Sequence, residues 1–309
     1  MSARGSRLGL AAALLVAAAG IGAPAAQPAG KGKPSTCAEH RQAFKRFSAE
    51  VTTRCSGGLL YVSSNGLPDH EVMVGITRWI WQVPLPQPYV GENSLRIPLR
   101  PRVARQITES TGKGAVGVAV NGIPIFKPTD GSGIYTPEHD PNLTGELDHC
   151  GGHAGGADDY HYHYGSDCLV HELGSKGALA GYAIDGFPIY GYREPDGDKH
   201  GKLDRCNGHR TKGLGYHYHF TRDRPYVVLC YRGTPAFPNQ PATTPVRMPH
   251  GPEAVTITAA TASEQGGTVQ VTSGAASGGV GWTMTSPSCW FFSITEPGRP
   301  ADLENHCRP

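Results

Sequence analysis

Residues 160–164 read Tyr-His-Tyr-His-Tyr, and residues 216–220 read Tyr-His-Tyr-His-Phe. The side chains of a β-strand alternate between its two faces, so the histidines of each stretch share one face and the aromatic residues occupy the other. Imidazoles two residues apart begin roughly 6.5 Å apart at the backbone, close enough for both rings to reach one metal ion. The pattern predicts two strands that carry four principal candidate metal ligands: His161, His163, His217 and His219.

Both stretches belong to a longer internal repeat. Residues 147–153 and 203–209 lie 56 residues apart and match, so the spacing Cys-x2-His-x7-His-x-His occurs twice. Residues 117–126 and 181–190 also match, at an offset of 64 residues. We expect the two copies to pack about a pseudo-twofold axis and to bring the two His-x-His pairs together at the interface between the repeats.

Three further histidines are weaker candidate ligands. His153 and His209 occupy matched positions beside glycines, which suit a loop that turns the ring inward. His70 follows the Asn65-Gly66 turn signal, and it is either an additional ligand or an exposed loop histidine.

Matched acidic and amide residues flank these motifs. Asp148 and Asp204 precede the matched cysteines. Each is a carboxylate ligand, orients a histidine from outside the ligand shell, or caps a turn through backbone amides. Asn121 and Asp185 each precede a glycine in a strong hairpin signal. We expect no catalytic role for Asp185, because the turn role explains both members of the pair.

The doubled motif, together with the sequence Asn-Gly-Leu-Pro-Asp-His at residues 65–70, resembles the bacterial YHYH domain family. The resemblance covers roughly residues 58–236, and residues 203–233 carry its most specific part. It implies the extent of the domain and a location outside the cytoplasm. It implies no particular reaction.

The N-terminus has the pattern of a secretory signal peptide. Arg4 and Arg7 precede an apolar run over residues 8–21, and small residues follow at 23–26. This run is shorter than the ~20 residues that span a bilayer, so we expect cleavage after Ala25 or Ala26 and a secreted or periplasmic protein without a membrane anchor. The remaining chain carries 26 basic and 26 acidic residues, which gives no support for nucleic-acid binding.

Eight cysteines in an exported chain favour disulfides. Local pairing is the simplest arrangement, although eight cysteines allow 105 connectivities. The alternative makes Cys150 and Cys206 thiolate ligands of zinc. The expected disulfides are Cys37–Cys55, Cys150–Cys168, Cys206–Cys230 and Cys289–Cys307.

The composition predicts a mostly β, loop-rich protein, because 42 glycines and 26 prolines make up over a fifth of the 309 residues. We expect an internally duplicated antiparallel β-sandwich or barrel-like domain and one short N-terminal helix within residues 37–51. The expected parts are a signal peptide (1–25), a linker with the disulfide-stapled helix (26–57), the duplicated domain (58–236, with repeats at about 115–170 and 179–233), a Pro/Thr-rich linker (237–252) and a small C-terminal β appendage (253–309).

These features favour an exported metal-binding β-domain that holds zinc or copper. An open coordination position would allow metal-dependent hydrolysis or copper redox chemistry. An enzyme without metal would need a pair such as His161 and Asp148 as base and orienting group. A structural or adhesion module, in which the Tyr/His strands simply pack, is the other alternative. The sequence does not identify catalytic residues, a substrate or a partner.

Overall fold

The computed structural model describes residues 36–309, except 112–113 and 237–240. The predicted signal peptide and most of the linker that follows it lie outside the described residues. The described chain is mostly strand, as predicted, and none of its helices is long and apolar enough to cross a membrane.

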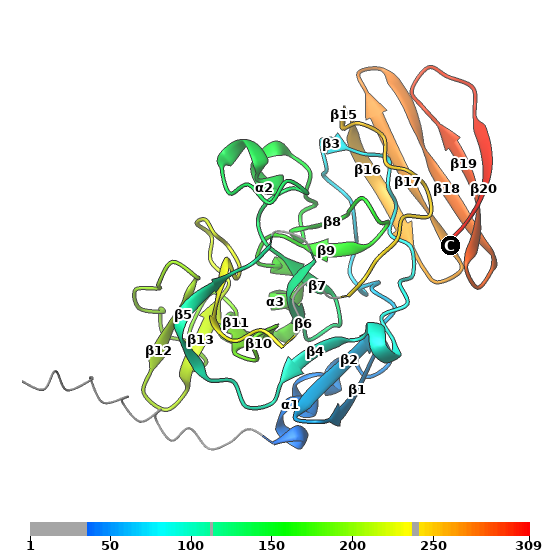
Figure 1. Ribbon diagram of the computed structural model, residues 1–309. Coiled ribbons are helices and arrows are strands. Elements are labelled where there is room, and N and C mark those ends of the chain that lie inside the picture. Colours follow the sequence, from blue (N-terminus) through cyan, green and yellow to red (C-terminus); the bar gives the residue numbers. More distant parts are fainter. Residues whose placement is uncertain (1–35, 112–113, 237–240) are drawn as a thin grey trace, which may run out of the picture. The chain divides into compact units, whose positions relative to one another are not determined.

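An eight-stranded sheet forms the centre of the doubled region (Figure 1). Its strand order reads alike from both ends, because the β6–β7–β9–β8 half mirrors the β10–β11–β13–β12 half about the antiparallel pair β6 and β10. The strands in sheet order are β12 (Gly208–Thr211), β13 (Gly215–His219), β11 (Pro188–Tyr190), β10 (Leu179–Ala183), β6 (Ala115–Ala119), β7 (Pro124–Phe126), β9 (Tyr160–Tyr162) and β8 (Gly152–Ala154).

Two of the neighbouring pairs in this sheet are parallel: β7 with β9, and β11 with β13. The sheet is therefore mixed, and its order ends at β8 and β12 without closing. The sheet therefore differs from the predicted antiparallel sandwich or barrel because it contains parallel pairs and because it does not close. The parallel pairs arise because each His-bearing strand returns beside the second strand of the preceding hairpin after a long connection.

The N-terminal helix is shorter than predicted. Helix α1 (Cys37–Ala43) begins at a capping box formed by Thr36 and Glu39, and the 3-10 helix η1 (Lys45–Phe47) follows it. Phe44 and Phe47 are both buried. The chain then enters a three-stranded sheet of β1 (Val51–Ser56), β2 (Leu59–Ser64) and β4 (Leu95–Pro98).

Two short helices were not predicted. Helix α2 (Pro141–Thr144) begins at Asp140, and helix α3 (Asp167–Leu173) begins at Ser166, whose side chain accepts from the Leu169 amide. The segment around Cys168 is helical, whereas Cys230 begins a strand. The remaining short elements are β3 (Arg78–Trp79) paired with β15 (Glu253–Ala254), β5 (Val103–Glu109) paired with β14 (Cys230–Gly233), and the 3-10 helices η2 (Gly91–Asn93) and η3 (Pro137–His139).

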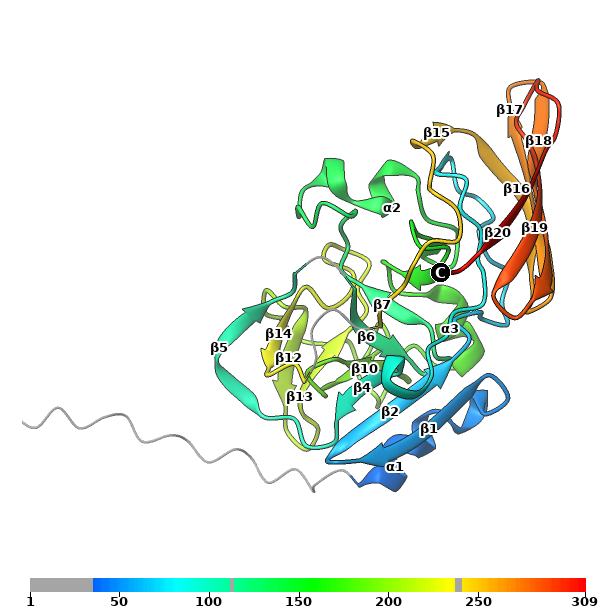
Figure 2. The same ribbon diagram turned by 45° about the vertical axis from the view of Figure 1, so that its right-hand side comes forward.

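The C-terminal residues form a five-stranded antiparallel meander (Figure 2). Backbone hydrogen bonds join Ile257 to Gly75 and Ile76, and the Arg308 guanidinium donates to the Pro86 carbonyl. The meander is thus bonded to residues of the 72–90 segment. Its strands are β16 (Thr256–Ala262), β17 (Gly266–Ser273), β18 (Ala276–Ser286), β19 (Cys289–Thr295) and β20 (Asp302–Cys307).

All four predicted disulfides are present: Cys37–Cys55, Cys150–Cys168, Cys206–Cys230 and Cys289–Cys307. Thiolate ligation by Cys150 or Cys206 is therefore wrong for this structure.

Candidate metal centres

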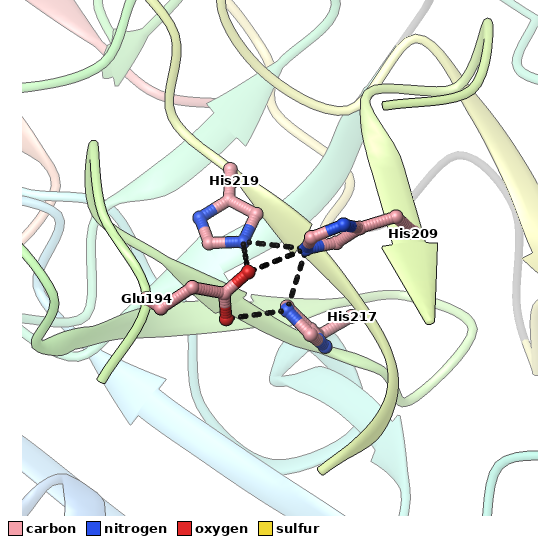
Figure 3. A group of neighbouring side chains, drawn as sticks. All are labelled: Glu194, His209, His217 and His219. Carbon is pink, nitrogen blue, oxygen red and sulfur yellow. Dashed lines mark hydrogen bonds and ion pairs between the residues drawn. The ribbon is translucent and has the colours of Figure 1, made fainter. Parts of the chain in front are cut away.

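One cluster of possible metal ligands lies at the β12 edge of the central sheet (Figure 3). His209 comes from β12, His217 and His219 come from β13, and Glu194 comes from the turn after β11. We call these four residues the second cluster. The Nε2 atom of His209 lies 3.0 Å from Nε2 of His217 and 3.2 Å from Nε2 of His219. The Glu194 carboxylate lies 2.8 Å from His209 Nε2 and 3.2 Å from His217 Nε2.

Backbone carbonyls fix the orientation of two rings in the second cluster. His217 Nδ1 lies 3.1 Å from the Gly215 carbonyl oxygen, and His219 Nδ1 lies 3.0 Å from that of Gly191. A carbonyl only accepts, so Nδ1 carries the hydrogen in each neutral ring and the Nε2 lone pair faces the cluster. Metal-bound histidines are commonly held in this way by a carbonyl or carboxylate outside the ligand shell.

Two of the histidines in the second cluster are shielded from water. His217 and His219 are fully buried, and burial lowers the pKa of His219 to about 3. Glu194 Oε1 is buried, and it lies 2.8 Å from His209 Nε2 and 3.6 Å from His219 Nε2. A zinc ion with Zn–N bonds of about 2.05 Å holds tetrahedral ligands about 3.3 Å apart, close to the nitrogen separations found here. The chemistry and the spacing of these atoms fit a metal ion.

The first cluster lies near the other end of the sheet and consists of His153 from β8 with His161 and His163 from β9 and its end. The Nε2 atoms of His161 and His163 are 2.9 Å apart, and the His153 ring centre lies 5.0 Å from that of His161. His161 Nδ1 lies 2.9 Å from the Asp159 carbonyl oxygen, and His163 Nδ1 lies 2.6 Å from that of Lys127. Both lone pairs therefore face the cluster, as in the second one.

The two His-x-His pairs do not meet. Strands β9 and β13 are separated by β7, β6, β10 and β11, and five steps of ~4.8 Å amount to roughly 24 Å. The predicted single site at the interface of the repeats is therefore wrong. The β6–β10 contact places the His-bearing strands on opposite sides of the sheet's centre, and each pair forms a cluster with its own upstream histidine, His153 or His209.

Asp148 and Asp204 do not orient the histidines. Asp148 accepts from the Cys150 amide at 2.9 Å and from the Tyr160 hydroxyl at 2.7 Å. Asp204 accepts from the Cys206 amide at 2.9 Å, and its other oxygen accepts from the Tyr216 hydroxyl at 3.0 Å. The turn-capping alternative is confirmed, and the predicted role outside the ligand shell is wrong because both carboxylates bond tyrosines on the opposite strand face.

His70 also belongs to the tyrosine face. Its Nε2 lies 2.6 Å from the Tyr162 hydroxyl, and its Nδ1 lies 2.8 Å from the Glu71 carbonyl oxygen. It joins neither histidine cluster; the sulfur atoms near it, Cys150 and Cys168, are disulfide-bonded. His70 thus lies on the face that carries Tyr162, apart from both histidine clusters.

Glu194 is the residue that the sequence reasoning missed. It lies 64 residues after Asp130, the offset that also relates Phe126 to Tyr190. An acidic residue at the same place in both repeats was therefore a usable signal. Its turn contains several other acidic residues, which made it look like solvent-exposed sequence.

An open pocket of about 390 Å³ adjoins His209 at the edge of the sheet. Its lining includes three cationic side chains and one carboxylate, that of Asp204. Asp204 forms an ion pair with Arg232 and accepts a hydrogen bond from the Tyr216 hydroxyl. The lining residues are Val103, Lys202, Leu203, Asp204, Gly208, His209, Arg210, Tyr216 and Arg232.

Comparison with known proteins supports the domain resemblance. No curated protein and no solved structure matches the chain. A family model described as YHYH protein matches residues 94–198, a range that contains the whole first cluster and Glu194 but ends before His209. The match confirms the resemblance to the YHYH family, which this chain carries over residues 94–198.

Proposed function

We propose that the protein binds two divalent metal ions, one at each histidine cluster. The observation that carries the proposal is the orientation of the His-x-His pairs. His161 and His163 donate Nδ1–H to backbone carbonyls, so two Nε2 lone pairs face each other at 2.9 Å. Lone pairs at this distance repel unless a cation lies between them.

The second cluster supports the same proposal with a larger ligand set. His217 and His219 direct lone pairs towards His209, and the Glu194 carboxylate adds negative charge to the same point. One proton can satisfy one of these contacts, whereas a divalent ion satisfies all of them. Imidazole with carboxylate and no thiolate suits Zn(II) or Cu(II), so we propose one of these metals.

We propose that the ions complete two copies of one structural unit. Each cluster joins an edge hairpin, β8–β9 or β12–β13, to the connection that follows β7 or β11 through the Lys127 or Gly191 carbonyl. The four disulfides support a location outside the reducing cytoplasm, where we propose that the protein acts.

The test is metal content per chain, measured by mass spectrometry on protein purified without a histidine tag. We expect near two equivalents in the wild type, near one in His161→Ala, near one in His217→Ala and near zero in the double variant. His171→Ala, an exposed residue of α3, is the matched control and should keep two. Wild-type protein that takes up neither zinc nor copper would refute the proposal and favour a structural module of packed Tyr/His strands.

A further inference from the structure

The two clusters differ at one corresponding position. Asp130 and Glu194 each lie four residues beyond the end of a matched strand, β7 or β11. The residues that directly follow these strands, Lys127 and Gly191, hold His163 and His219 through equivalent carbonyl contacts. The local backbone thus offers a carboxylate to both clusters.

The Asp130 carboxylate is bonded to residues outside the first cluster. One of its oxygens accepts from the Ser132 amide at 2.9 Å and from the Ser132 hydroxyl, and the other lies 2.7 Å from His139 Nδ1. These contacts close the 130–139 loop, whose ends also join through the Asp130 amide and the His139 carbonyl. The Asp130 side chain is 35% exposed, whereas that of Glu194 is 11% exposed and faces its histidines.

The number of protein ligands differs as a result. The second cluster offers three histidines and one carboxylate, and the first offers three histidines. Four protein ligands are typical of closed, structural zinc sites, whereas three leave a position for water or substrate. The three imidazoles are neutral ligands, and the buried Asp159 carboxylate lies 3.4 Å from His161 Nδ1 without belonging to the cluster, so an anionic fourth ligand is favoured.

We propose that the first cluster is the reactive metal site and the second is structural, an inference that rests on the proposed function. The fourth position at the first cluster takes water or a small anion such as hydroxide or azide. His161 and His163 are each 4% exposed, and the Phe126 ring stacks on His161 with ring centres 3.9 Å apart, so the ligand is small. The metal there acts as a Lewis acid on that ligand.

Azide binding to protein loaded with two Cu(II) ions per chain tests this assignment. The azide-to-copper charge-transfer band reports exogenous ligation, and metal is quantified on the same samples. We expect saturation at one azide per chain in the wild type. The band should persist in His217→Ala, which keeps the first site, and disappear in His161→Ala, which keeps the second. Azide bound equally at both sites, or at neither of two loaded sites, would overturn the assignment.

Glu194→Ala supplies a gain-of-function control in an otherwise intact chain. Removing this carboxylate opens the second site, so we expect two azides per chain at unchanged copper content. A variant that still binds one azide with two coppers would contradict the closing role of Glu194. Failure of the two-ion proposal itself would appear separately, as copper content below two before azide is added.

Discussion

At the scale of single residues, the alternating motif serves both faces of its strand. The histidines form the clusters, while the tyrosine hydroxyls bond matched turn residues behind them. Tyr160 donates to Asp148 and Tyr218 donates to Asp185, each at 2.7 Å. At the position matched to Tyr218, the Tyr162 hydroxyl instead accepts from the Asn121 side-chain amide at 3.0 Å. These bonds anchor the strands that carry the ligands to the neighbouring turns.

Asp185 gives a pH test of this tyrosine face. Burial raises its pKa to about 6 from 3.8, so the folded state holds the proton more tightly than the unfolded state. The stabilisation from protonated Asp185 is present below pH 3.8 and is lost as pH rises through about 6. Asp185→Asn removes this titration. We expect the variant's stability relative to wild type to improve between pH 4 and 7 by up to about 3 kcal/mol.

Urea unfolding at several pH values measures this difference. Asp198→Asn, at an exposed turn position, is the control and should show no such change with pH. Parallel stability curves for the wild type and Asp185→Asn would contradict the buried, proton-holding role of Asp185.

At the scale of elements, a glycine in each edge strand leaves room for a tyrosine side chain of the neighbouring strand. A Cβ atom on Gly208 would press on the Tyr216 hydroxyl and lie 2.7 Å from the His217 carbonyl oxygen. Gly152 stands in the same relation to Tyr160 in the first copy. Both positions allow close approach within the hairpin that carries a cluster.

Gly208→Ala should therefore weaken the second metal site without altering a ligand. We expect a loss of about 1–3 kcal/mol in unfolding free energy and a lower metal affinity at that site only. Gly251→Ala, where a Cβ would meet nothing within 4 Å, is the matched control. Calorimetric metal titration of His161→Ala, with and without Gly208→Ala, isolates the second site. Equal affinities would show that hairpin geometry does not control binding.

Local features of the elements were predictable from the sequence, and their neighbours in space were less so. The His-x-His faces and the four disulfides follow from short-range spacing. The separation of the clusters depends on the parallel β7–β9 and β11–β13 pairs, which form across long connections. Glu194 joins its cluster from the connection after β11, a placement that depends on the folded path of that connection.

At the scale of the whole molecule, comparing two disulfides separates an effect on one metal site from an effect on the stability of the whole protein. Cys150–Cys168 and Cys289–Cys307 both link residues 18 apart. The loop-entropy model gives each about 3 kcal/mol of stability. Cys150 lies in the turn that leads into β8 and the first cluster, whereas Cys289–Cys307 joins β19 to β20 in the C-terminal meander.

Replacing each pair by alanines should lower unfolding free energy by similar amounts and change metal binding differently. We expect C150A/C168A to retain about one ion per chain, because the turn that positions His153 loses its anchor. C289A/C307A should retain about two. Mass-spectrometric metal analysis of both folded variants makes the comparison. Equal retention in the two would contradict a role of the first bridge in the first site.

The central claim, two separate metal sites in one chain, is tested most directly by anomalous X-ray diffraction from crystals of the metal-loaded protein, recorded at the zinc or copper edge. We predict two peaks per chain, one among the rings of His153, His161 and His163, and one among Glu194, His209, His217 and His219. A single peak shared by the two His-x-His pairs, or no peak at either cluster, would contradict it.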